Sequence, residues 1–225
     1  MKVLGLLGMP GSGKTTALKS LEDRVDHDFS GLKMKDVAAK EFNKMQENGL
    51  EYFPKEMRGT IKSNDLVDEA TPDGRLGDEI ANWVDFVLSI NGSYFAEEAK
   101  TKIQGMTETD VVVVDGIRSV SDVENVMEAA DVFRLVYLQT PFHTRLERLK
   151  DRGREGEEDI DAQYLLKRDK QEFSWGIDEI LASYQKGYSD YEKEYPVEHF
   201  YANHDTVSSF EVEFNFYVDD LFDLN

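Results

Sequence analysis

The sequence contains no cysteine among its 225 residues. Disulfide bonds, thiolate zinc sites and cysteine nucleophiles are therefore excluded. Positive charge is scarce as well: 26 Lys and Arg stand against 46 Asp and Glu, a formal net charge of −20. Such an acidic surface repels phosphate backbones, so we expect binding neither to nucleic acid nor to an anionic membrane. The acidity fits a high-salt cytoplasm, where ions screen self-repulsion, and fits an ordinary acidic protein equally well.

Long apolar runs are also absent, since none approaches the roughly 18 residues of a membrane span. The N-terminal apolar run is short and leads directly into a glycine-rich motif, so it predicts a buried strand rather than a signal peptide. We therefore expect a cytoplasmic protein. With 40% hydrophobic residues, the chain can form one well-buried core.

Three apolar, β-branched segments have the pattern of strands that are buried on both faces: 3–7, 111–116 and 133–139. A segment with a helical pattern follows each of them: 14–24, 119–130 and 142–152. This alternation predicts an α/β fold with a parallel central sheet. Near the C-terminus, 199–203 predicts a last short strand and 207–222 a closing helix, although the alternation in the latter also fits a strand.

Between the first strand and residue 111 the sequence shows no strong strand signal. Three of its segments have helical patterns instead: 36–49, 77–92 and 93–103. The second ends at an Asn-Gly pair, and the third opens with a serine suited to cap a helix. We therefore predict a mostly helical insert between the phosphate loop and the next core strand.

The stretch GMPGSGKTT, residues 8–16, matches the phosphate-loop pattern G-x-x-x-x-G-K-[ST]. Its glycines let backbone N–H groups turn towards phosphate oxygens, while Lys14 reaches the β and γ phosphates and the Thr15 hydroxyl contacts Mg²⁺. A helix that begins here adds its positive dipole end. An ordinary glycine-rich turn is the alternative, but the strand before and the helix after favour a nucleotide site. The candidate nucleotide-binding residues are Gly8, Pro10, Gly11, Ser12, Gly13, Lys14, Thr15 and Thr16.

The second motif is VVVVDGIRS, residues 111–119. A carboxylate at the end of a buried strand beside a phosphate loop can bind Mg²⁺ directly or through water, and Asp115 has this place. Arg118 would then bind a phosphate through two parallel hydrogen bonds. The alternative is a strand-ending aspartate in a turn, followed by a surface arginine.

Arginines concentrate after the third strand in a chain that is otherwise acidic. Arg148 and Arg152 are four residues apart and hence share a helical face. With Arg154 and Arg168 they would form a closing lid that neutralises a transferring phosphoryl group and excludes water. Ion pairs with neighbouring carboxylates on the same helix are the alternative.

Taken together, the phosphate loop, the helical insert, the DGIRS segment and the arginine-rich segment resemble the nucleoside monophosphate kinases. That group includes adenylate kinase and, more loosely, dephospho-CoA kinase. Adenylate kinases carry Asp-Gly-x-Pro-Arg at the second motif, whereas residues 115–118 here lack the proline. The chain is most similar to an uncharacterised archaeal family of kinase-like P-loop proteins that share GMPGSGK, DGIRS and a stretch of the form RGR…RD…E…SWG. Here that stretch comprises residues 152–154, Arg168-Asp169, Glu172 and residues 174–176. The resemblance covers most of residues 1–180.

The resemblance implies a P-loop NTPase three-layer sandwich within one domain. It divides the chain into a core, an acceptor-binding helical insert and a short lid: 1–35, 104–145 and 176–225; 36–103; and 146–175. It also implies a reaction in which the γ-phosphoryl group of Mg·ATP passes to a small phosphate acceptor, most readily a nucleotide, in a monomer or homodimer.

The resemblance assigns roles residue by residue. Lys14, Thr15 and Asp115 serve the donor side, with Thr15 and Asp115 holding the Mg²⁺. Arg118 holds the acceptor phosphate, with Asp36 and Asp115 at the acceptor site. The lid candidates for charge neutralisation are Arg148, Arg152, Arg154 and Arg168.

One departure concerns the acceptor. Related kinases open the acceptor helix with a Gly-Asp-x-x-Arg segment, whose arginine binds the acceptor phosphate. The matching stretch here runs from Lys35 to Ala39, with alanine at the arginine position. Either another basic residue compensates or the acceptor differs; the candidates are Lys35, Lys40, Arg58 and Arg75. A P-loop ATPase that acts on a protein partner therefore stays as the alternative function, whereas the charge of −20 disfavours a kinase for nucleic-acid ends.

Overall fold

The computed structural model describes residues 1–48, 75–152, 160–184, 197–204 and 206–224. Within these ranges the chain forms a five-stranded sheet of order β2-β3-β1-β4-β5, and every pair of neighbouring strands is parallel. The strands are β1 (Lys2–Leu7), β2 (Phe29–Lys33), β3 (Val111–Asp115), β4 (Val132–Gln139) and β5 (Val197–Tyr201). The predicted α/β fold with a parallel sheet is confirmed.

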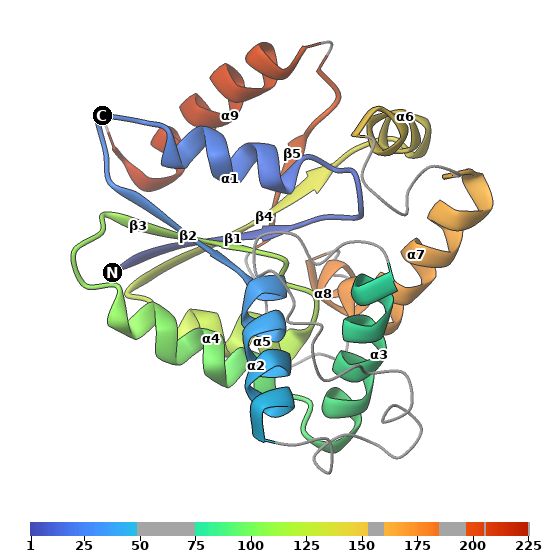
Figure 1. Cartoon of the computed structure of the whole chain (residues 1–225). Helices are drawn as coiled ribbons and strands as arrows, with labels where there is room; N and C mark the ends of the chain where they lie inside the picture. Colours follow the sequence, from blue (N-terminus) through green and yellow to red (C-terminus); the bar gives the residue numbers. More distant parts are fainter. Residues whose placement is uncertain (49–74, 153–159, 185–196, 205, 225) are drawn as a thin grey trace.

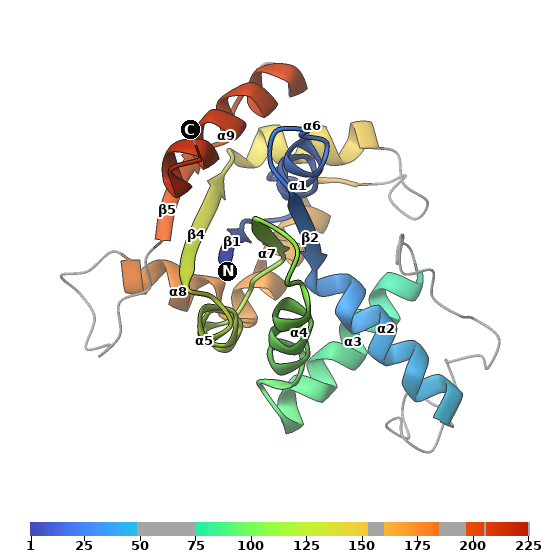
Figure 2. The same cartoon turned by 90° about the vertical axis from the view of Figure 1, so that its left-hand side faces the viewer.

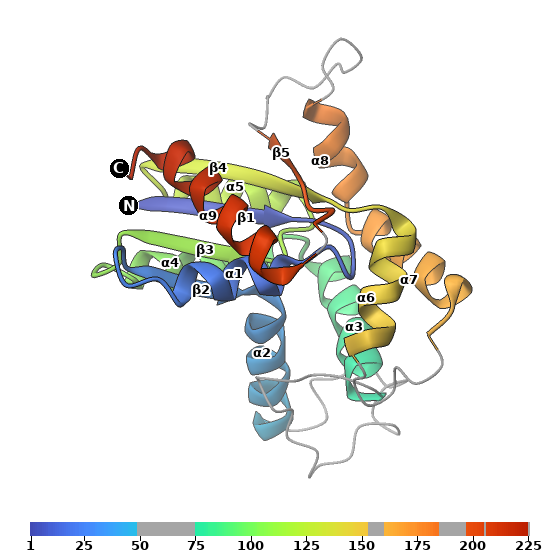
Figure 3. The same cartoon turned by 90° about the horizontal axis from the view of Figure 1, so that it is seen from above.

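Helices cover both faces of the sheet, which gives three layers (Figure 1). The helices are α1 (Lys14–Glu22), α2 (Met34–Asn48), α3 (Arg75–Ile90), α4 (Tyr94–Gly105), α5 (Val120–Glu128), α6 (Phe142–Arg152), α7 (Ala162–Ser174), α8 (Ile177–Tyr184) and α9 (Val207–Phe222). The turned view shows α1 and α9 on one side of the sheet, with α4 and α5 on the other (Figure 2). Helices α3, α6 and α7 lie beyond the carboxyl ends of the strands, and α2 leads away from the sheet at the end of β2 (Figure 3). None of the helices in the described ranges is long and apolar enough to cross a membrane.

Successive strand residues point to opposite faces, so each strand contributes to two apolar cores. Val3 and Val112 pack with the helices on one side, whereas Leu4 and Val113 pack against α1 and α9 on the other. All four residues have no exposed surface. Burial on both faces explains why β1 and β3 are near-continuous apolar runs.

The sequence shows no strong strand signal between the first strand and residue 111, yet β2 spans Phe29–Lys33 and pairs with β3 along its length. Its sequence, FSGLK, buries only Phe29 and Leu32 and contains a glycine, so the local strand signal is weak. Edge pairing with β3 supplies the hydrogen bonds that the local pattern does not predict. Helix α2 begins directly after this strand, at Met34.

Candidate functional site

The candidate site lies where the chain leaves β1 and β3, which are neighbours in the sheet. The connection that follows β1 leads to β2 at one edge of the sheet, whereas the connection that follows β3 leads to β4 in the opposite direction. The two connections therefore diverge at this point. Parallel α/β sheets bind ligands at the carboxyl ends of such strands. Leu6 of β1 aligns with Asp115 of β3. The register therefore brings the phosphate loop next to a buried carboxylate.

The loop after β1 has a backbone that requires glycine. Gly11 and Gly13 have φ angles of 78° and 101°, in the left-handed region. A Cβ on Gly11 would lie 2.8 Å from the backbone oxygen of Arg145, so the loop packs tightly against α6. Helix α1 starts after Gly13, has no side-chain cap at its N-terminus and carries no acidic residue in its first turn. Its first N–H groups therefore face a position that suits an anion.

Lys14 lies folded against this loop. Its Nζ donates to the Gly8 carbonyl oxygen and, at 3.4 Å, to the Met9 carbonyl oxygen. Burial lowers the pKa of Lys14, while the carboxylates of Asp115 and Glu172 oppose that shift. A bound phosphate would restore the charge balance. The loop therefore fits a nucleotide phosphate by its backbone, its helix end and its lysine.

Two side-chain oxygens that could hold a magnesium ion belong to residues at the loop and at the end of β3. Asp115 is 7% exposed at the end of β3, and the neighbouring Gly116 donates its N–H to the Leu6 carbonyl oxygen at 3.4 Å. Thr15 is exposed in the first turn of α1. A carboxylate and a hydroxyl are the hard oxygen donors that Mg²⁺ prefers, so the residues fit the predicted ion. Ser12 contributes a buried hydroxyl oxygen that has no hydrogen-bond partner among the described residues.

Arg118 follows β3 and is held in place by α7 and the residue after it. Its Nε donates to Glu172 Oε2 at 2.6 Å, and its guanidinium carbon lies 4.8 Å from the ring centre of Trp175. Its backbone N–H donates to Asp122 at 2.9 Å. Burial alone would lower the pKa of Arg118, but the nearby carboxylates, Glu172 foremost, outweigh it, so the pKa is raised. Arg118 therefore stays charged.

Arg145 and Asp169 form a second buried pair, which sequence reasoning missed. Two hydrogen bonds of 2.8 and 2.7 Å join the guanidinium of α6 to the carboxylate of α7. The same guanidinium donates to the Pro10 carbonyl oxygen at 3.1 Å. The pair thus fixes α6 and α7 against the phosphate loop. The spacing of Asp169 and Glu172, three residues apart on one helical face, was the available signal.

The other arginines of this segment lie in different places. Arg148 donates to the backbone oxygens of Ser12 (3.5 Å) and Ala202 (3.1 Å), so it supports the phosphate loop and the chain after β5. Arg152 is exposed at the end of α6, and Arg168 is half-buried on α7. Arg154 lies outside the described residues, as does Arg58.

The start of α2 was predicted to serve the acceptor. Asp36 and Lys35 are half-buried in the first turn, and Lys40 is exposed. Ala39 is fully buried within the apolar core that includes Phe42 and Trp83. An arginine at this position would have to displace core side chains. The structure thus brings together Lys14, Asp115 and Arg118, while position 39 belongs to the core.

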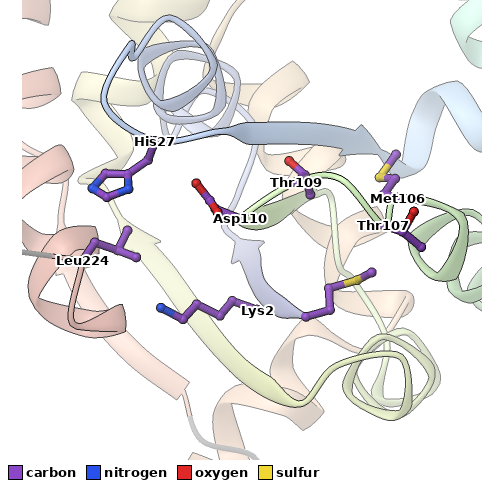
Figure 4. A pocket seen from close by; sticks show the side chains of 8 residues that line it. Lys2, His27, Met106, Thr107, Thr109, Asp110 and Leu224 are labelled. Carbon is purple, nitrogen blue, oxygen red and sulfur yellow. The ribbon is translucent and has the colours of Figure 1, made fainter.

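A hollow of about 530 Å³ lies at the opposite, amino-terminal edge of the sheet (Figure 4). Its two charged side chains from β1 and the chain before β3 are engaged within the protein: Lys2 Nζ donates to the Phe222 carbonyl oxygen at 3.0 Å, and Asp110 accepts from the Asp28 N–H at 3.0 Å. Because the phosphate loop lies at the other end of the strands, this hollow is separate from the candidate site.

Comparison with known proteins agrees with the geometry. A family model described as "AAA domain" matches residues 4–166. A UPF0200 protein of Methanothrix thermoacetophila is 28% identical over 189 residues, covering 81% of this chain and 85% of that protein. A UPF0200 protein of Methanosarcina acetivorans is 30% identical over 183 residues, covering 80% and 81%.

Among solved structures, the chain is similar to TT1252 from Thermus thermophilus. The two share a TM-score of 0.55 at 15% identity, and the match covers 98% of this chain and 97% of that one. At this identity the similarity shows a shared fold.

Proposed function

This chain belongs to the UPF0200 family and to the AAA domain family, and we propose that it is an ATP-dependent phosphotransferase. It would move the γ-phosphoryl group of Mg·ATP to a nucleoside or deoxynucleoside monophosphate, or to a related small phosphorylated metabolite. The AAA domain itself implies nucleotide binding at a P-loop.

One observation carries the proposal: two cationic side chains that follow different strands lie within electrostatic range of one buried carboxylate. Lys14 follows β1, Arg118 follows β3, and both interact electrostatically with Asp115. Donor phosphates would bind to Lys14 and the start of α1, and Thr15 and Asp115 would hold Mg²⁺. The ion, when bound, would neutralise charge on the phosphate oxygens.

Arg118 supports transfer rather than hydrolysis alone. Its guanidinium suits a phosphate because two parallel N–H groups match two phosphate oxygens. Glu172 and Trp175 already fix its orientation, which reduces the entropy lost when a second substrate binds. Phosphoryl transfer depends on the positioning of the two substrates more than on covalent chemistry by the protein. A guanidinium that is already oriented for a phosphate suits this reaction. Arg148, Arg152, Arg154 and Arg168 stay predicted lid residues.

The buried position of Ala39 favours a second candidate function. Related kinases carry an acceptor-binding arginine at the corresponding place, whereas this position is closed within the core. A P-loop ATPase that hydrolyses ATP to change its conformation on a protein partner would need no such arginine.

An ADP-release assay over nucleoside monophosphates, deoxynucleotides and dephospho-CoA separates the two functions. Transfer predicts that one acceptor class stimulates turnover. Lys14→Ala should abolish activity in either case, whereas Arg118→Ala should raise the acceptor KM or lower kcat while ATP still binds. Lys19→Ala, an exposed lysine on α1, serves as the charge control. A basal ATPase rate that no acceptor changes would contradict the phosphotransferase proposal.

A further inference from the structure

Trp175, the residue directly after α7, contacts two parts of the protein that are distant in sequence. One face of its ring lies against the guanidinium of Arg118, with 4.8 Å between the guanidinium carbon and the ring centre. Its Nε1 donates to Asp85 Oδ1 at 2.5 Å, a contact between residues 90 positions apart. Asp85 belongs to α3, within the predicted acceptor insert. One side chain therefore connects that insert with Arg118.

The chain around Trp175 is built for this close approach. Gly176 has a φ of 111°, and a Cβ there would lie 3.5 Å from the Arg118 carbonyl oxygen and from Ser119 Cα. The segment after α7 therefore packs in van der Waals contact with the backbone that carries Arg118. Glu172 lies on α7 and accepts from Arg118 Nε. Arg118 is therefore held both by a residue of α7 and by the residue directly after it.

These contacts leave the two Nη groups of Arg118 for a ligand. Among the described residues, Nε is the guanidinium nitrogen of Arg118 that donates a hydrogen bond, and the side chain is 30% exposed. The two Nη groups form the edge that binds a phosphate through two parallel hydrogen bonds. The direction of that edge follows the tilt of the guanidinium plane, which the Trp175 ring sets by stacking.

We propose that Trp175 is a positioning residue for Arg118 and that the Asp85–Trp175 hydrogen bond transmits the position of α3 to it. Movement of α3 when an acceptor binds would shift the indole and thereby align the Nη edge with the acceptor phosphate. Asp85 and Trp175 thus make acceptor binding depend on the insert, without touching the acceptor themselves. The inference rests on the proposed function for the identity of the anion as an acceptor phosphate.

The test uses the full chain saturated with Mg²⁺ and the β,γ-imido analogue of ATP, so that the donor site is filled. Inorganic phosphate is then titrated by calorimetry, and Arg118→Ala identifies the part of the binding that belongs to this site. Trp175→Leu removes the ring and should weaken phosphate binding by about tenfold, consistent with a partly desolvated cation–π contact. Trp175→Phe keeps a ring face but loses the bond to Asp85, and should weaken it about threefold.

Asp85→Ala should match Trp175→Phe, and the double variant should be no worse than either single one, because both remove the same hydrogen bond. Phe173→Leu, an exposed aromatic residue on the same helix, and Glu97→Ala, an exposed acid on α4, are the controls and should leave the affinity unchanged. The affinity for the ATP analogue should stay at the wild-type value in all these variants, which general loss of structure would not allow.

The outcomes separate this inference from the proposed function. Phosphate binding that is absent in the wild type, or unchanged in Trp175→Leu, overturns the inference. Additive effects of Asp85→Ala and Trp175→Phe overturn the link to α3. If binding depends on Trp175 as expected but no acceptor stimulates turnover, the positioning inference holds and the phosphotransferase proposal fails.

Discussion

The ion pair between Arg145 and Asp169 offers a quantitative test of how the site is held together. Their side chains are 7% and 11% exposed, and Arg145 makes two hydrogen bonds to Asp169. Asp169→Ala would leave the guanidinium charge buried with its main partner removed. Breaking a buried pair in this way costs about 3–5 kcal/mol. That is a large share of the roughly 5–15 kcal/mol by which folded proteins are stable.

A double variant separates stability from function. Arg145→Met combined with Asp169→Leu removes both charges while keeping apolar volume. Such replacements are often neutral or stabilising, so most of the lost free energy of unfolding should return. Nucleotide affinity should nevertheless be weakened in the double variant, because the Pro10 carbonyl oxygen of the phosphate loop would lose the donor that Arg145 provides. A hydrogen bond to a charged group contributes about 1.5–3 kcal/mol.

Urea unfolding followed by circular dichroism gives the free energies, and calorimetry with ATP gives the affinities. Glu128→Ala is the control, because Glu128 pairs with Lys100 at the surface with 63% of its side chain exposed. Exposed pairs contribute only about 0–1 kcal/mol. This role of the ion pair is excluded if Asp169→Ala lowers the free energy of unfolding no more than this control does, or if the double variant is as unstable as Asp169→Ala.

Three further variants test other parts of the structure. Gly11→Ala should lower the melting temperature and weaken ATP binding, because the φ of 78° and the Arg145 backbone oxygen, which would lie 2.8 Å from a Cβ, both oppose a side chain. Gly105→Ala is the control, because a Cβ there would meet open space. Equal melting temperatures of the two variants would contradict this. Burial and the bond to Glu41 raise the pKa of Tyr94 to about 12, so the stability that this proton confers is present below pH 10 and is lost as the pH rises towards 12. The unfolding free energy of Tyr94→Phe should therefore fall less steeply over that range than that of the wild type, and parallel curves would count against it. Burial lowers the pKa of Lys14, so its positive charge should be lost at a pH below 10.5. ATP affinity measured by calorimetry should therefore begin to decline below pH 10.5 in the wild type but not in Lys14→Arg. Identical pH profiles of the two proteins would exclude this explanation.

The local parts of the fold were predictable, and the reason is their residue pattern. β1 and β3 are buried on both faces, which requires continuous apolar runs, and Gly11 and Gly13 adopt backbone angles that other residues avoid. β2 was not predicted, since a short edge strand depends on pairing with β3 more than on its own residues.

The partners of the charged residues could not be read from the sequence. Arg118 pairs with Glu172 across 54 positions and Arg145 with Asp169 across 24, so each choice depends on how α7 packs against the core. Arg148 was predicted as a lid residue, yet it donates to the backbone of the phosphate loop and of the chain after β5. The direction in which α6 leaves β4 determines where the Arg148 side chain lies. The spacing of the arginines in the sequence does not reveal that direction.

The most direct test of the proposed transfer follows the γ-phosphoryl group itself. ATP labelled at the γ position is incubated with Mg²⁺, the protein and each nucleotide acceptor in turn, and the products are separated by chromatography. The two-sided site at Lys14 and Arg118 predicts that label appears in one phosphorylated acceptor, and that Arg118→Ala reduces this product while ATP still binds. Label found entirely in inorganic phosphate, whatever the acceptor, would contradict the account.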